Sequence, residues 1–224
     1  MLQGARLFIA AGRSILCKGD LHIRGTLRNP VFVRAQDDAA PFGALALVGS
    51  GSQQCSIGGL YISGGSGAKL AGVQCSGMLT VQGAARTLVV ASVLQANTAA
   101  ASLAVDGGEV QLRDVRFEDD ARQFARLTHV RGVLRDITMV GARTNSTNGL
   151  YIGTGTVALS GGVFTKLNGT AIHADEAAQV LVRRVRLSQN ATAIRSEGRA
   201  EVHVEGNTID GNAMVFATSG TAPG

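Results

Sequence analysis

The 224-residue chain contains no tryptophan, and its aromatic residues amount to only 4%. Proline occurs three times and glycine 30 times, so neither a collagen-like chain nor a disordered proline-rich chain fits. No apolar run approaches the roughly 18 residues that a membrane-spanning helix requires. Hydrophobic residues nevertheless make up 45%, which is enough for a sizeable core. The sequence therefore predicts a folded chain without a membrane span.

Cysteine is also scarce. Cys17, Cys55 and Cys75 are odd in number and show no CxxC or Cys/His ligand spacing. We expect them to be small buried side chains. The sequence leaves a Cys55–Cys75 disulfide as an alternative. Ser/His/Asp, HExxH and EF-hand patterns are missing as well. The sequence thus predicts neither a metal site nor a cofactor.

The net charge is +5 and the pI about 9.6, which suits an anionic partner such as an acidic polysaccharide. Nucleic acid is not the expected partner, because the basic residues are not interleaved with aromatics and no nucleic-acid motif is present. The first residues make a poor signal peptide, since Arg6 and Arg13 interrupt the apolar stretch.

A repeat in the second half is the strongest pattern. Two apolar columns recur together at intervals of 22, 25, 23 and 22 residues. The first column is Leu112, Leu134, Leu159, Val182 and Val204, and the second, five residues further on, is Phe117, Met139, Phe164, Leu187 and Ile209. A period in the low twenties indicates one supersecondary unit stacked on the next.

The repeat units alternate apolar and polar residues, as in 109–113 and 201–205, which indicates strands. Stacked strands of this kind predict an all-β fold, a single-stranded right-handed parallel β-helix (β-solenoid) of about 8–9 coils of roughly 22 residues. We expect one domain over 1–218, less regular in 1–100 and regular in 101–218, followed by a tail at 219–224.

Two insertions are predicted. The 25-residue interval predicts a longer loop at 141–148. In the first half, an offset of 32 residues would pair Leu47, Ile57 and Ile62 with Leu79, Val89 and Leu94. This larger coil predicts extra residues within 64–76.

The coils from Gly169-Thr-Ala-Ile172 to Gln189-Asn-Ala-Thr-Ala-Ile194 resemble the right-handed β-helix repeats of pectate-lyase-like proteins. The opening segment Asp20–Leu27 with Pro30–Val33 is similar to the first coils of bacterial cell-surface β-helix proteins. The resemblance implies the fold and an extracellular or cell-surface location. It does not select among lyases, hydrolases, adhesins and scaffolds.

Strand alternation identifies a stripe of outward residues. If Leu150, Ile172 and Ile194 point inward, their neighbours point outward. The outward positions are then Arg126, Tyr151, His173, Asp175, Arg195 and Glu197, with Asp106 further along. The resemblance implies that a sugar chain would bind along such a strand face. Arg126 and Arg195 would pair with uronate carboxylates, and Tyr151 would stack on a sugar ring.

A catalytic set within this stripe would be His173, Asp175 and Glu197, which could transfer protons. Asp175 and Glu197 are expected on adjacent coils about 4.8 Å apart, a spacing compatible with either a retaining or an inverting glycosidase. A calcium-dependent lyase would need more converging carboxylates. The alternative is an exposed ion-pair ladder with no catalytic role.

A second strip is basic. Arg113 and Arg135 are in register, with Arg183 and Arg184 at the matching place further on. With Arg116 and Arg186 they could bind an acidic polymer, or they could pair with acidic residues across coils at about 0–1 kcal/mol each.

The turns and the ends complete the prediction. Asn168, Asn190 and Asn212 precede the strands that open successive coils and suit turns. No amphipathic helix precedes Leu7, and a Gly/Ser/Thr/Pro segment follows Phe216, so nothing in the chain is predicted to cover the strand edges at the two poles. The chain would then be part of a larger protein, or its copies would stack end to end.

The favoured prediction is a non-catalytic structural or glycan- and partner-binding module at the cell surface. The alternatives are a polysaccharide lyase or glycoside hydrolase acting on an acidic polysaccharide, and a viral tailspike-like fibre.

Overall fold

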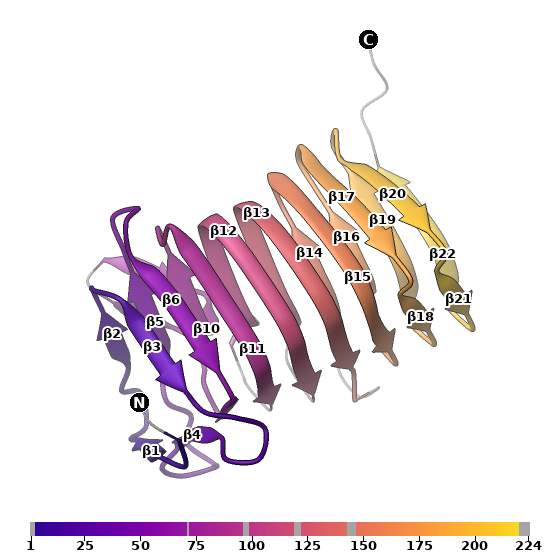
Figure 1. Cartoon of the computed structure of the whole chain (residues 1–224). Helices are drawn as coiled ribbons and strands as arrows, with labels where there is room; N and C mark the ends of the chain where they lie inside the picture. The colour runs from indigo at the N-terminus through magenta and orange to yellow at the C-terminus, as the bar shows by residue number, and fades with distance from the viewer. Residues whose placement is uncertain (1–2, 71, 96–98, 119–121, 143–146, 220–224) are drawn as a thin grey trace.

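The computed structural model describes residues 3–70, 72–95, 99–118, 122–142 and 147–219. It is an all-β solenoid of about 9 turns with about 23 residues per turn, and the described residues contain no helix. Figure 1 shows the turns, here called coils, stacked from the N-terminal end to the C-terminal end. The predicted parallel β-helix is confirmed.

Each coil has three sides, so the strands form three columns. Column A contains β2 (Ile15–Cys17), β5 (Leu45–Val48), β10 (Gly77–Gln82), the starts of β12 (Ala101–Glu118) and β13 (Gln123–Val140), then β14 (Asn148–Ile152), β16 (Thr170–Ala174), β19 (Thr192–Glu197) and β22 (Met214–Ser219). The outer sides of columns A, B and C are called face A, face B and face C.

Columns B and C follow column A around each coil. Column B contains β3 (Leu21–Arg24), β6 (Gln54–Gly58), the start of β11 (Arg86–Gln95), the middle of β12 and β13, the start of β15 (Gly155–Thr165), β17 (Ala178–Arg183) and β20 (Glu201–Glu205). Column C contains β1 (Arg6–Ile9), β4 (Val31–Ala35), β7 (Leu60–Ser63), the ends of β11, β12, β13 and β15, then β18 (Arg186–Ser188) and β21 (Thr208–Asp210).

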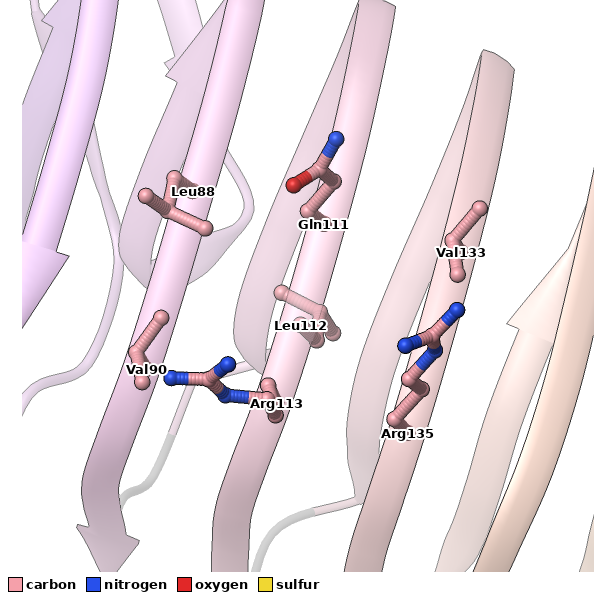
Figure 2. A pocket seen from close by; sticks show the side chains of 7 residues that line it. All are labelled: Leu88, Val90, Gln111, Leu112, Arg113, Val133 and Arg135. Atoms are coloured by element: carbon pink, nitrogen blue, oxygen red, sulfur yellow. The ribbon is translucent and has the colours of Figure 1, made fainter.

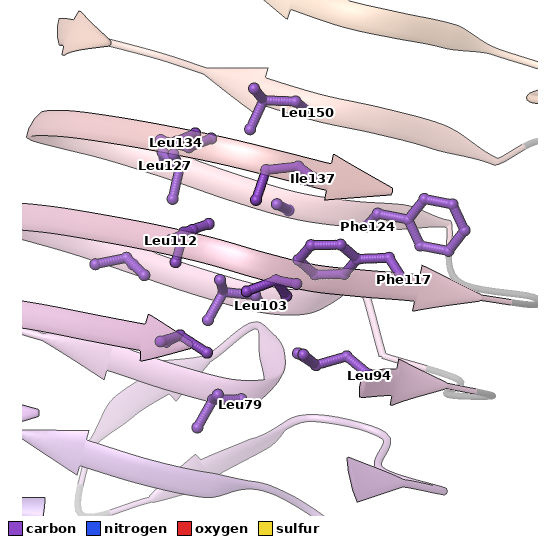
Figure 3. Packing of buried hydrophobic residues seen from close by; sticks show 14 of the residues in the cluster. Leu79, Leu94, Leu103, Leu112, Phe117, Phe124, Leu127, Leu134, Ile137 and Leu150 are labelled. Atoms are coloured by element: carbon purple, nitrogen blue, oxygen red, sulfur yellow. The ribbon is translucent and has the colours of Figure 1, made fainter. Parts of the chain in front are cut away.

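The two apolar columns found in the sequence are rows of stacked side chains inside the solenoid. Phe117 pairs with Met139, which pairs with Phe164, and all three are fully buried. Leu112 pairs in the same way with Leu134 and continues to Val204 in the last coil. Figure 3 shows the middle coils of this interior. Each fully buried side chain of this size contributes about 1.5–3 kcal/mol.

A left-handed residue bends the chain between columns B and C. Asp114, Asp136 and Arg184 have φ of 52°, 54° and 51°, and Gly161, at the equivalent place, has φ of 70°. The bend explains how Leu112 and Phe117, five residues apart, both point inward. In a straight strand an odd separation would place them on opposite faces.

One predicted register is wrong. Leu79 pairs with Leu45, not with Leu47, whose partner is Val81. The predicted pairs Ile57–Val89 and Ile62–Leu94 are confirmed. The difference arises at the corner between columns A and B, which contains residues 49–53 in one coil and only 83–85 in the next.

The insertion predicted within 64–76 is an ordered hairpin. Strands β8 (Ala68–Leu70) and β9 (Val73–Cys75) pair antiparallel within 64–76. The hairpin packs Ala68, Leu70 and Cys75 on Leu16 and Ala46 of face A and forms a small second apolar cluster. It therefore covers face A over the opening coils. Of the loop predicted at 141–148, residues 143–146 lie outside the described residues.

The two poles differ in exposure. At the C-terminal pole Val204, Phe216 and Met214 are 52%, 48% and 50% exposed. The inward residues Leu21 and Ile23 of the first coil are buried. Of the predicted tail 219–224, Ser219 ends β22 and the rest lies outside the described residues.

The cysteines are free thiols. Cys55 and Cys75 are buried, as predicted, and Cys17 is half-buried. Burial raises the pKa of the Cys55 thiol to about 12, with a smaller contribution from Cys17. A search of the described residues found no helix with the length and apolar character needed to cross a membrane.

Candidate functional site

The structure places four residues of the predicted stripe side by side on face A. Arg126 pairs with Tyr151, Tyr151 with His173, and His173 with Arg195 along successive coils. The first three are flanked on both sides by buried residues, and Arg195 follows the buried Ile194, so all four side chains point outward. This is the placement that strand alternation predicts.

The side chains of this row contact one another. The Arg126 guanidinium carbon lies 4.6 Å from the centroid of the Tyr151 ring, a cation–π distance. The Tyr151 and His173 rings are 5.2 Å apart and nearly perpendicular. Because Arg126 lies over the Tyr151 ring, that face of the ring is not free to stack on a sugar.

Asp175 and Glu197 lie in the neighbouring outward row. The Tyr151 hydroxyl donates to Asp175 Oδ2 at 3.1 Å, and the backbone N–H of Glu176 donates to Oδ1 at 2.7 Å. The pKa of the Tyr151 hydroxyl is raised, first by partial burial and then by its hydrogen bond to Asp175. Tyr151 is therefore a neutral hydrogen-bond donor at neutral pH.

Glu197 is the hub of the cluster. Its Oε1 accepts hydrogen bonds at 2.7 Å from both Ser219 Oγ and Arg195 Nε, and its Oε2 lies 2.9 Å from His173 Nε2. The hydrogen bond from Ser219 lowers the pKa of Glu197 to about 2, with further lowering from Arg195 and His173 against an opposing effect of burial. With this pKa the carboxylate is ionised near neutral pH, which does not suit the proton donor of a glycosidase.

Asp106 lies further along face A, apart from this cluster. Its Oδ1 accepts a hydrogen bond from Thr128 Oγ1 at 2.9 Å and lies 2.8 Å from His129 Nδ1. Asp106 and His129 line one hollow of face A, and Arg122 and Asn148 line another. Arg126 lines both hollows and so connects the stripe to them.

A further hollow lies on face B, where β11, β12 and β13 run side by side. Its volume is about 410 Å³, and Figure 2 shows its lining residues. The apolar part is formed by Leu88, Val90 and Val133, the last 41% exposed. Arg113 and Arg135 lie in one row at its edge, one coil apart.

The basic residues of the predicted strip differ in their ion pairs. Arg183 pairs with Glu205 on the next coil at 2.8 Å, and Arg186 with Asp210 at 3.2 Å. These two cross-coil pairs follow one of the two alternatives left open by the sequence.

Arg113 and Arg135 of the same strip line the hollow. Arg113 contacts its own neighbour, Asp114, at 3.7 Å, and is 62% exposed. Arg135 forms no ion pair with any described residue. The hollow therefore combines an apolar floor with a cation available to a ligand.

Sequence reasoning missed two features. It treated His173, Asp175 and Glu197 as proton carriers or as members of an ion-pair ladder, although one ligand atom from each lies within 4.8 Å of the others. It also placed Ser219 in a tail, whereas Ser219 stacks beside Glu197 in the column A register. The 22-residue spacing from Glu197 to Ser219 repeats the spacing from Asp175 to Glu197 and could have revealed it.

Comparisons with protein-family models, with curated proteins and with solved structures each found no match to this chain.

Proposed function

We propose that this chain is a rigid, non-catalytic β-helix module of the bacterial cell-surface type that binds an acidic polysaccharide on face B. The observation that carries the proposal is the hollow in which Arg113 and Arg135 border an apolar floor. Their strands are about 4.8 Å apart, so two guanidinium groups can meet successive anionic groups of one polymer. The cell-surface setting rests on the resemblance of the opening coils to such proteins.

The chemistry of face B and face A supports binding without turnover. Uronate sugars offer carboxylates to arginine and C–H surfaces to aliphatic side chains such as Leu88 and Val133. On face A the catalytic candidates are held by hydrogen bonds within the protein: His173 with Glu197, and Asp175 with Tyr151. The lowered pKa of Glu197 keeps this carboxylate ionised near neutral pH, which does not suit a general acid.

The test is binding of polygalacturonate, with neutral dextran as the comparison polymer. We expect saturable binding of polygalacturonate only, and weaker binding at higher salt because charges are screened. Arg135→Gln should weaken binding at least tenfold. Arg183→Gln is the matched control, since Arg183 lies on the same face outside the hollow and is held by Glu205. The affinity of Arg183→Gln for polygalacturonate should stay within about twofold of that of the unaltered chain.

Two results would overturn the proposal. Equal weakening by the two arginine variants, or no binding at all, would remove the hollow as the binding site. Shortening of the polymer, abolished by Asp175→Asn or Glu197→Gln, would instead establish the alternative, a polysaccharide lyase or glycoside hydrolase acting on face A.

A second role, end-to-end assembly, is favoured by the two poles. Among the described strands, β20, β21 and β22 each pair on one side only, with β17, β18 and β19, and β1, β2 and β3 pair only with β4, β5 and β6. We propose that the N-terminal pole of a second copy covers the C-terminal pole. Such head-to-tail contacts build an open filament.

The strand register supports this stacking. Phe216 ends the inward row that Ile15 begins, and Val204 ends the row that Ile23 begins. Stacked copies would continue both rows and cover the exposed Phe216 and Val204. In the outward row of face B, Glu205 of one copy would meet Arg24 of the next, which gives complementary charge.

Sedimentation over a range of protein concentrations tests the assembly. We expect association that Phe216→Asp abolishes. Val163→Asp is the control, because Val163 is also exposed but points outward on face C. A monomer at all concentrations, or an equal effect of the two variants, would contradict the end-to-end contact.

A further inference from the structure

One imidazole and two carboxylate side chains converge on face A near the C-terminal pole. His173 belongs to β16, Asp175 follows β16 directly, and Glu197 ends β19 on the next coil. The register of β16 and β19 sets His173 beside Arg195 and Ala174 beside Ser196, so Asp175 and Glu197 extend from neighbouring backbones. One ligand atom from each of the three residues lies within 4.8 Å of the other two.

We propose that His173, Asp175 and Glu197 bind a divalent first-row transition-metal ion of the zinc class. One imidazole nitrogen and two carboxylate oxygens are ligands that Zn²⁺ accepts at about 2.0–2.2 Å. In a tetrahedral site such ligand atoms lie about 3.4 Å apart. The most distant pair, within 4.8 Å, would close by at most about 1.4 Å, and the His173–Glu197 pair at 2.9 Å would open slightly. Ca²⁺ suits this set less, because it takes six to eight oxygen ligands.

Two of the three ligand atoms are already in contact. His173 Nε2 and Glu197 Oε2 face each other at 2.9 Å, and a bound ion would replace this hydrogen bond. The side chains of His173 and Glu197 are 22% and 21% exposed. The site is thus partly shielded from solvent yet open enough for water or another ligand to occupy a fourth position.

Neighbouring groups hold the carboxylates in place. Tyr151 donates a hydrogen bond to Asp175, and Ser219 and Arg195 donate to Glu197 Oε1, which leaves Oε2 toward His173. Outer contacts of this kind orient metal ligands and contribute to affinity. Two carboxylates against the single charge of Arg195 leave the cluster with net negative charge when His173 is neutral.

A bound ion would join two coils that are otherwise linked by strand hydrogen bonds and core contacts. The joined strands, β16 and β19, lie close to the exposed C-terminal pole. Ligand binding to the folded state alone raises its stability. The ion would therefore stabilise the last coils, independently of whether face B binds a polysaccharide.

The experiment uses the full chain, freed of metal by chelation and titrated with ZnCl₂ and CoCl₂ without any polysaccharide. We expect one Zn²⁺ per chain by calorimetry, a visible Co²⁺ spectrum of four-coordinate type, and a higher melting temperature with zinc. His173→Ala should lose at least tenfold in affinity along with the Co²⁺ spectrum. His203→Ala is the matched control, since His203 is an exposed strand histidine on face B.

A second variant keeps the test decisive if His173→Ala folds poorly. Asp175→Asn removes one ligand charge with little change of shape, and its folding is checked by circular dichroism. It should also weaken zinc binding at least tenfold. No saturable binding by the unaltered chain, unchanged affinity in folded His173→Ala or Asp175→Asn, or equal loss in His203→Ala would overturn the proposal.

Discussion

Asn212 Oδ1 accepts a hydrogen bond at 2.9 Å from the backbone N–H of Asn190, the residue one coil earlier. Asn190 does the same for Leu167 at 3.1 Å, and its Nδ2 donates to the Phe164 carbonyl at 3.0 Å. The two asparagines form a ladder at the corner between columns C and A. The predicted third member, Asn168, lies one position off the ladder, because Leu167 occupies that place.

Substitution of Asn190 by alanine should destabilise the fold. Asn190 is 3% exposed, and its loss leaves the N–H of Leu167 and the carbonyl of Phe164 without these partners. We expect a loss of about 2–4 kcal/mol in the free energy of unfolding, measured by urea denaturation. The exposed Asn168, changed to alanine, should cost less than about 1 kcal/mol. Similar losses in both variants would contradict the ladder.

Thr87 should be stabilised by a change to valine. Its side chain is fully buried between Cys55 and Val110, and its hydroxyl has no hydrogen-bond partner among the residues that the structure describes. Valine keeps the shape without the unpaired hydroxyl, so we expect a gain of about 1–2 kcal/mol in the free energy of unfolding. Thr80→Val should have the opposite sign, because the equally buried Thr80 hydroxyl donates to the Gly77 carbonyl at 2.9 Å. Destabilisation by Thr87→Val would disprove this account.

Met139 tests the stacked core. It lies between Phe117 and Phe164 and is fully buried, so Met139→Ala leaves a cavity that the neighbouring coils cannot fill. We expect a loss of about 2–5 kcal/mol. Thr138→Ala, an outward neighbour, should cost less than about 1 kcal/mol in the same chemical denaturation. A small effect at Met139 would mean that the coils repack freely.

In the metal-free protein, Glu197 should make the stability of the fold depend on pH in the acidic range. Its folded pKa of about 2 is below the usual 4.5, so the ionised form stabilises the fold above about pH 4.5. This stability is lost as the pH falls from about 4.5 through about 2. Melting temperatures measured across this range should fall less steeply for Glu197→Gln than for the unaltered chain. Parallel curves would show that the carboxylate contributes nothing.

The interior could be predicted from the sequence because stacked coils bring identical positions into contact. Leu112 stacks on Leu134, and Leu134 stacks on Leu159. Each coil therefore needs an apolar residue at the same position. The three-sided shape was also encoded, in the odd spacing between Leu112 and Phe117, which requires a bend between two inward residues. The left-handed Asp114 and Asp136 supply that bend.

The site was less predictable, since outward side chains are placed by contacts and not by periodicity. Alternation set Tyr151 and His173 on face A, but it did not show that Arg126 covers the Tyr151 ring. The partners of Glu197 depend on side-chain rotamers and on Ser219, in the last described strand. The hollow beside Arg135 depends on small variations in side-chain length along the coils, which carry no periodic signal.

The corner between columns C and A differs in length from coil to coil, from 211–213 at one extreme to 64–76 at the other. The second of these segments includes the β8–β9 hairpin, yet Ile57 and Val89 stay in register across it. Foreign peptides grafted at this corner should therefore leave the scaffold intact. They would be displayed beside face A, which makes the solenoid a natural carrier for engineered recognition loops.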